Sequence, residues 1–205
     1  MGAAIVLAGG SVVLLGCLIW IIPNTAYSTE VGFAPPQPVP FSHEHHVGGL
    51  GIDCRYCHTA VETSASAGMP ATEICMTCHS QIWTNAAMLA PVRESLARGV
   101  PLQWNRVYTL PDYVYFDHSI HLAKGVGCTE CHGDVAKMPL LHKAHSLYMG
   151  WCLDCHRDPG AHLRPLDAVF DPDWHRTAAT PPPERLMALY RIHPATLADC
   201  SVCHR

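Results

Sequence analysis

An unbroken apolar block opens the chain, and after it the apolar positions recur only irregularly. From Ala3 to Ile22 no residue is charged. A helix rises about 1.5 Å per residue, so about 20 such residues span about 30 Å, the thickness of a bilayer's hydrocarbon layer. Pro23 and Asn24 end the block. The pattern predicts a transmembrane anchor over residues 1–22.

A cleaved secretory signal is the alternative interpretation of this block, because its apolar core has a similar length. No small-x-small cleavage site follows the apolar run at once, which favours a retained anchor. Leu14–Cys17 loosely resembles a lipoprotein box, but a small apolar residue facing lipid or another helix is the simpler interpretation of Cys17. The first basic residue is Arg55, so flanking charge does not set the orientation of the anchor.

Three later segments have patterns of their own. Residues 23–40 contain five prolines and predict an extended, semi-rigid tether to a domain over 41–205. Residues 80–98 predict a helix that breaks or restarts at Pro91. Residues 106–116 are aromatic and extended, and residues 157–183 are a long irregular stretch that we expect to lie against a partner or a bound group.

Composition narrows the function classes. The 205 residues carry 17 Asp and Glu against 13 Lys and Arg, a formal net charge of −4, which argues against a nucleic-acid partner. The chain also contains 11 Cys and 15 His, unusual numbers for its length. These counts argue against an ordinary cytosolic enzyme with an apolar core.

Ten of the cysteines form CxxC pairs, and a histidine follows every pair directly. The five CxxCH sites are Cys54–Cys57–His58, Cys75–Cys78–His79, Cys128–Cys131–His132, Cys152–Cys155–His156 and Cys200–Cys203–His204. Two thiols at this spacing can each bond one vinyl group of the same haem, and the next residue presents its imidazole to the iron. A zinc site or a redox disulfide also uses CxxC, but neither explains the histidine in all five cases. The motifs predict five covalently bound haem c groups.

Attachment of haem c fixes the compartment. It takes place on the outer side of an energy-coupling membrane, where conditions are oxidising. We therefore expect a single-pass protein of the bacterial inner membrane, with the haem domain on the periplasmic side and the N-terminus inside.

The chain contains a duplicated unit. Residues 41–58 match residues 116–132 with one residue fewer before the first cysteine. Each copy, 41–79 and 116–156, reads FxHxxH, then CxxCH, then a second CxxCH, and the fifth site at 200–204 stands alone.

Low-spin haems need a second axial ligand each, and each FxHxxH can supply two imidazoles from one helical turn. The four candidates are His43, His46, His118 and His121. His45 breaks the spacing and is not expected to be a ligand. The fifth distal ligand is open among Met149, His142, His145, His162, His175 and His193.

The domain after the tether has about 33 residues for each haem, too few for an ordinary protein core. We expect a mainly α fold with extensive coil, in which short helices carry the CxxCH sites and the packed haems form the core.

The anchor, the doubled FxHxxH unit, the stretch MGWCLDCHR (149–157) and the ending LADCSVCHR (197–205) together resemble the pentahaem cytochrome c subunit of alternative complex III. The resemblance covers the chain from about residue 41 to its end. It implies a bacterial quinol:electron acceptor oxidoreductase in which this subunit relays electrons. It also implies mostly bis-His haems and one His/Met haem, for which Met149 is the matching methionine, although His142 and His145 lie close by.

The resemblance further implies partners. These are polytopic quinol-binding membrane subunits, an iron–sulfur subunit, membrane lipid and a periplasmic acceptor that is a cytochrome c, a copper protein or an iron–sulfur protein. A free-standing multihaem quinol dehydrogenase is the alternative, and a multihaem redox enzyme with an open haem site is a further one. An enzyme would need an iron with a free coordination position, and nothing in the sequence marks one.

Overall fold

The polypeptide forms helices and turns joined by long connections, as a computed structural model of residues 2–204 shows. Among these residues the only β-pairing is two isolated bridges, Val114 with His204 and Val126 with Leu163. The α-helices are α1 (Gly2–Ile21), α2 (Ala26–Thr29), α3 (Cys54–Cys57), α4 (Thr72–His79), α5 (Ala90–Arg98), α6 (His118–Ala123), α7 (Cys128–His132), α8 (Met149–Arg157), α9 (Pro183–Leu189), α10 (Pro194–Leu197) and α11 (Cys200–Cys203). Short turns of 3-10 or π-helix are η1 (Ile22–Asn24), η2 (Glu44–Gly49), η3 (Ala87–Leu89), η4 (Val135–Lys137), η5 (Pro159–His162) and η6 (Leu166–Ala168).

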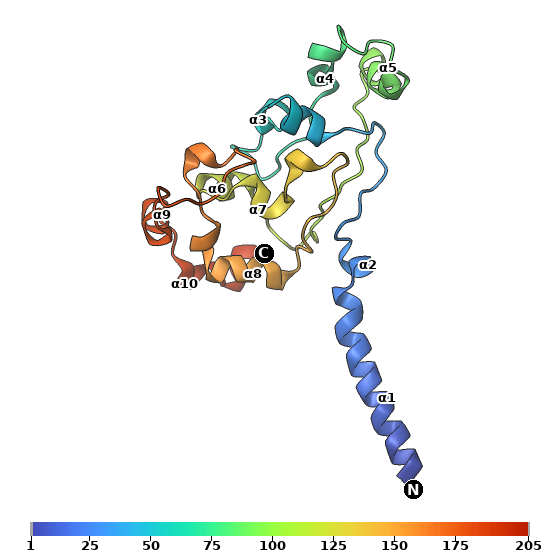
Figure 1. The fold of residues 1–205 in the computed structure, drawn as a ribbon, viewed down its shortest axis with the longest axis vertical. Coiled ribbons are helices and arrows are strands. Elements are labelled where there is room, and N and C mark those ends of the chain that lie inside the picture. Colours follow the sequence, from blue (N-terminus) through green and yellow to red (C-terminus); the bar gives the residue numbers. More distant parts are fainter. Residues whose placement is uncertain (1, 205) are drawn as a thin grey trace.

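The first helix, α1, matches the predicted anchor and extends away from the rest of the chain (Figure 1). Residues 6–24 have a mean hydropathy of 2.3, and none of this stretch is buried in the protein. Within the described residues, it is the one helix long and apolar enough to cross a bilayer.

The tether differs from the extended expectation, because it contains a helical turn and packs on the domain. Thr25 caps α2 by accepting a hydrogen bond from the Ser28 amide. Farther on, Gly32 donates to the Lys143 carbonyl at 2.8 Å, and Lys143 donates to the Phe33 carbonyl at 3.3 Å. The tether therefore runs along the domain surface and is fixed there.

Between the two repeated units, the predicted helix is shorter than expected. Helix α5 begins at Ala90, and Pro91 occupies its first turn, where a missing amide proton costs nothing. Residues 80–86 form turns instead. Gly99 ends the helix with a φ of 63°, a left-handed conformation that suits glycine.

The stretch over residues 157–183 is irregular, as expected, and contains only the short turns η5 and η6. Leu163, Arg164 and Val169 within it are each at most 2% exposed. Contact of this stretch with a partner or a bound group stays a prediction. Leu163 packs with Leu186 of α9. Leu166 in the same stretch is 50% exposed, so only some of its apolar side chains point inward.

Apolar side chains gather in three small clusters. Their buried members are Val39, Leu89 and Val92 in the first, Val61, Leu122 and Val169 in the second, and Leu163, Leu186 and Tyr190 in the third. Cys75 packs on the first cluster and Cys128 on the second. Two of the three apolar clusters therefore lie directly beside CxxCH sites, as expected for a domain in which cofactors supply much of the interior.

Candidate cofactor sites

Every CxxCH motif lies on or at the end of a short helix, as expected. We number the motifs sites 1 to 5 in chain order; they lie on α3, α4, α7, α8 and α11 respectively. Two cysteines three residues apart share one face of a helical turn. At site 1 the turn starts at Asp53, whose carboxylate accepts a hydrogen bond from the Arg55 amide at 2.8 Å. Each helix therefore presents two thiols on one side and a histidine at its end.

In the first FxHxxH segment, one phenylalanine orders both histidines. The Phe41 ring stacks on His46 at 4.3 Å and meets His43 edge-on at 4.9 Å. His43 directly precedes the turn η2, which contains His46. The two imidazoles therefore leave the same turn in different directions.

The second FxHxxH segment repeats this arrangement closely. Phe116 stacks on His121 at 4.6 Å and meets His118 edge-on at 4.8 Å. Here the histidines lie on α6, with Asp117 capping the helix at the Ser119 amide. The sequence repeat is thus a repeat of side-chain geometry.

FxHxxH histidines face CxxCH histidines at a constant spacing. The ring centroids are 6.3 Å apart for His46 and His79, 6.3 Å for His118 and His132, and 6.2 Å for His121 and His156. Two imidazoles bound to one metal ion through bonds of about 2.0 Å have ring centroids about 6 Å apart. The three pairs therefore have the separation that two axial ligands of one iron require.

The fourth FxHxxH histidine, His43, is buried, and its ring contacts Phe41. Burial lowers the pKa of His43 to about 4, with smaller effects from the neighbouring His58 and His46. Its Nδ1 atom is buried without a hydrogen-bond partner. The three ring pairs leave His43 as the unpaired FxHxxH histidine and site 1 as the remaining site among sites 1 to 4.

Hydrogen bonds at Nδ1 orient most of these rings. The carbonyl acceptors are Ser42 for His46 (2.8 Å), Gly68 for His58 (2.8 Å), Ala65 for His118 (2.7 Å), Asp117 for His121 (2.7 Å) and Leu197 for His156 (2.9 Å). A ring that donates from Nδ1 keeps the lone pair of Nε2 for a metal. This second interaction is what fixes a ligand histidine in one orientation.

Burial keeps several of these imidazoles neutral. It lowers the pKa of His132 to about 4, and it also lowers the pKa of His121. Only the neutral imidazole can bind a metal ion, because protonation occupies its lone pair. The residues present therefore fit axial ligation of haem iron.

Site 5 differs from the other four. His204 donates from Nδ1 to the Tyr113 carbonyl at 3.3 Å, and its ring stacks on Tyr113 at 5.8 Å. Met149 lies at the start of α8 with 63% of its surface exposed. Among residues 2–204, no second histidine ring contacts His204. Met149 as the fifth distal ligand stays a prediction.

The other histidines named as candidates make different contacts. His145 stacks on Trp151 at 5.1 Å, and the His142 carbonyl accepts a hydrogen bond from Tyr108. His175 bonds to the Asp173 carbonyl, and His193 precedes α10. His45 meets His46 edge-on and lies on none of the CxxCH helices.

Arg164 is a buried residue beside site 3 that sequence reasoning missed. It is 2% exposed, and its guanidinium donates to Thr129 Oγ1 at 2.8 Å and to Glu130 Oε1 at 3.0 Å. Thr129 and Glu130 are the two residues between the cysteines of site 3. His162 lies 3.0 Å from the other oxygen of Glu130. No motif marks Arg164, so only the structure reveals that it supports this site.

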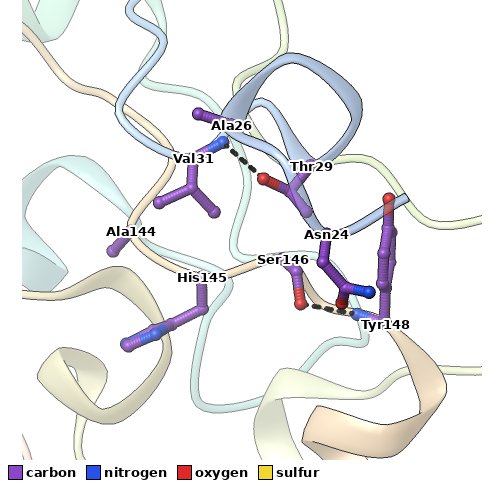
Figure 2. A pocket seen from close by; sticks show the side chains of 8 residues that line it. All are labelled: Asn24, Ala26, Thr29, Val31, Ala144, His145, Ser146 and Tyr148. Carbon is purple, nitrogen blue, oxygen red and sulfur yellow. Dashed lines mark hydrogen bonds between the residues drawn. The ribbon is translucent and has the colours of Figure 1, made fainter. Parts of the chain in front are cut away.

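A shallow hollow of about 400 Å³ lies where the tether meets the segment before α8 (Figure 2). Asn24, Thr29 and Val31 line it on the tether side, and His145 and Tyr148 line it from the domain. Figure 2 shows the His145 ring pointing away from the tether residues. The hollow therefore marks the junction of anchor and domain and contains no converging set of reactive groups.

Comparison with known proteins gives two matches. The model of the family described as "Cytochrome c7 and related cytochrome c" matches residues 39–89 and 114–205, which contain all five CxxCH sites and both FxHxxH segments. The chain is also 35% identical over 124 residues to a curated protein of Nitratidesulfovibrio vulgaris, the multihaem cytochrome c subunit of a menaquinone reductase. That match covers 60% of this chain and 56% of the relative, so the chain spans little more than half of the relative's length.

Proposed function

The chain belongs to the cytochrome c7 and related cytochrome c family, and on this premise we propose that it relays electrons within a membrane-bound, quinol-linked complex. The constant spacing of 6.2–6.3 Å between facing imidazoles carries the proposal. Haem c, when bound, supplies reversible one-electron chemistry at its iron. The chain's own contribution is to hold the irons of sites 1 to 4 each between two oriented imidazoles.

The proposal assigns each residue of the motifs a role. The ten CxxCH cysteines form the thioether bonds, and the five CxxCH histidines are proximal ligands. The distal ligands are His43 for site 1, His46 for site 2, His118 for site 3 and His121 for site 4. Met149 is the proposed distal ligand of site 5, where a thioether would raise the potential relative to bis-imidazole haem.

The proposed setting is a larger membrane complex. The relative is a subunit of a menaquinone reductase. The pentahaem subunit of alternative complex III, which the chain resembles, is likewise a multihaem cytochrome c subunit of a quinone-linked complex. We propose polytopic quinol-binding subunits and an iron–sulfur subunit as partners. The single anchor α1 would hold the haem domain on the periplasmic side, where a soluble cytochrome, copper protein or iron–sulfur protein would take the electrons.

Relay is favoured over catalysis at a haem because of the distal histidines. A substrate needs an open coordination position on iron, but sites 1 to 4 each have an imidazole available for that position. Those imidazoles lie on turns braced by Phe41 and Phe116.

Mass spectrometry and spectroscopy of the purified holoprotein test the proposal. We expect a mass increase corresponding to five haems and a spectrum that is almost entirely low-spin. Purification under mild detergent is expected to retain polytopic membrane subunits. Fewer than five haems, or stoichiometric carbon monoxide binding at sites 1 to 4, would contradict the relay.

A further inference from the structure

We propose that the chain arranges its five haem sites in one unbranched row, in the order 2, 1, 3, 4, 5, with site 2 farthest from the membrane anchor. This inference rests on the proposed function and adds the path of the electrons. The order differs from the order of the motifs along the sequence, and contacts between the elements that carry the sites support each neighbouring pair.

Sites 1 and 2 are neighbours because one turn serves both. His43 is the proposed distal ligand of site 1, and three residues later His46 faces His79 of site 2 at 6.3 Å. The hydroxyls of Tyr56 in α3 and Thr77 in α4 also hydrogen-bond at 2.8 Å, which joins the helices of the two sites directly. Two side chains three residues apart on one turn are separated by about 5–6 Å at their Cβ atoms. The two haems that share this turn must therefore lie against it together.

Sites 3 and 4 are neighbours for the same reason in the second unit. His118 faces His132 of site 3, and His121 faces His156 of site 4. Both histidines belong to the six-residue helix α6. The duplication thus produces two pairs of sites, each organised around one FxHxxH turn.

Contacts between site 1 and site 3 join the two pairs. The backbone amide and Nδ1 of His118 both donate to the Ala65 carbonyl, at 3.2 and 2.7 Å, and Ala65 follows site 1 closely in the chain. The Cys54 thiol also lies 4.0 Å from the Phe170 carbonyl, and the Cys128 amide donates to the neighbouring Val169 carbonyl at 3.4 Å. The first cysteines of sites 1 and 3 therefore contact the same short segment of the chain.

Site 5 follows site 4. His156 of site 4 donates from Nδ1 to the Leu197 carbonyl at 2.9 Å, and Leu197 ends α10 only three residues before Cys200. Helix α8, which carries site 4, also packs against α10. Site 5 is therefore held directly against site 4.

The row has a defined direction relative to the anchor. Tyr148, which precedes α8, donates its hydroxyl to the carbonyls of Pro23 and Ser28 at 3.2 Å, just after α1. Site 4 therefore lies near the anchor, whereas α4, with site 2, lies at the opposite end of the domain (Figure 1). Each transfer along the row oxidises one iron and reduces the next, and no bond forms or breaks.

Electron injection at site 2 tests the order. Ile82 is 55% exposed beside His79, so a ruthenium photosensitiser can be attached to an Ile82→Cys holoprotein. Cys17 is replaced by alanine in this background, because its exposed thiol would also react with the label. His43→Met, His118→Met and His121→Met then each give one haem a methionine ligand with a distinct absorption band.

After the flash, we expect the band of His43→Met to respond first, His118→Met second and His121→Met third, with a longer delay for each additional site. A response of His118→Met before His43→Met would overturn the order. If a methionine variant fails to bind its haem, a density map of the unmodified holoprotein decides, since site 1 should have sites 2 and 3 as its nearest irons. Five haems in another order would refute the row alone, whereas fewer than five would also refute the proposed function.

Discussion

At the scale of single residues, the main feature of this domain is the pairing of histidine rings across each candidate iron site. His121 and His156 have a centroid separation of 6.2 Å, and each donates from Nδ1 to a backbone carbonyl. The carbonyl fixes the ring, and the ring leaves Nε2 for iron. The candidate ligands could be predicted from FxHxxH and CxxCH, but the partner of each could not, because pairing depends on how distant segments pack.

Replacing one distal histidine should open one iron. We expect His121→Ala to convert site 4 from low-spin to high-spin and to bind about one carbon monoxide per chain, since an iron with a vacant axial position takes a small ligand. Carbon monoxide difference spectra of the reduced protein measure this. His175→Ala is the control, because His175 is exposed and contacts the Asp173 carbonyl. If His175→Ala bound carbon monoxide and His121→Ala did not, His121 would not be the distal ligand of site 4.

Arg164 is a residue for which the sequence offers no signal. Its importance comes from burial and from its bonds to Thr129 and Glu130, which only the folded chain brings together. Breaking a buried ion pair by removing one partner costs about 3–5 kcal/mol. Glu130 keeps His162 and some solvent contact, so we expect Arg164→Met to lower the free energy of unfolding by about 3 kcal/mol.

Denaturant unfolding of the holoprotein checks this value. Arg98→Met is the matched control, because Arg98 pairs with Glu94 at 2.9 Å but both side chains are more than half exposed. Such a surface pair contributes about 0–1 kcal/mol. Equal losses in the two variants would show that burial of Arg164 has no special role.

At the scale of elements, the turn η2 depends on close packing with η4. The Glu44 amide donates to the Met138 carbonyl at 3.0 Å, and a side-chain carbon at Gly48 would collide with the Ala136 carbonyl. The position must therefore be glycine for the two turns to approach. The sequence shows a glycine pair here, but not which of the two glycines the packing requires.

We expect Gly48→Ala to push η2 away from η4 and to displace His43 and His46 together. Overpacking of this kind costs about 1–3 kcal/mol. Thermal unfolding should show the loss of stability, and the low-spin signal should fall at two haems rather than one. Gly49→Ala is the control, since its added carbon would lie 3.6 Å from the Glu44 carbonyl, an ordinary contact. A defect limited to one haem would argue against the shared turn.

Element boundaries show where sequence reasoning works and where it fails. The anchor and the short helices at the CxxCH sites could be predicted, because hydropathy and motif spacing are local signals. The irregular course of residues 157–183 could also be predicted, but the burial of Leu163 and Val169 within it could not, since these residues follow no helical or strand period. The helical turn in the tether was missed because α2 spans only Ala26–Thr29 and shows no periodicity.

At the scale of the whole molecule, the tether fixes the domain to its anchor. Lys143 is only 7% exposed, and its amine lies 3.8 Å from the Glu30 carboxylate, while Tyr148 binds two carbonyls next to the anchor. The prolines of residues 23–40 predicted a stiff tether, and these contacts restrict its motion further. These contacts fix the position of the domain relative to the start of the tether.

Removing the Tyr148 hydroxyl should loosen this attachment. A hydrogen bond contributes about 1 kcal/mol, so we expect Tyr148→Phe to raise the rate of proteolysis within residues 23–40 about fivefold. Limited proteolysis of the protein in detergent measures the rate. Tyr27→Phe is the control, because Tyr27 is 93% exposed. An unchanged rate in Tyr148→Phe would mean that the other tether contacts suffice.

The shared FxHxxH turn has a consequence for how such chains evolve. If one turn supplies the distal ligands of two haems, as proposed, losing it would leave two irons without a distal ligand at once. Site 5 has no FxHxxH turn, so its distal ligand can change alone. In sites 1 to 4 the unit that evolution can alter is therefore the turn with both of its histidines.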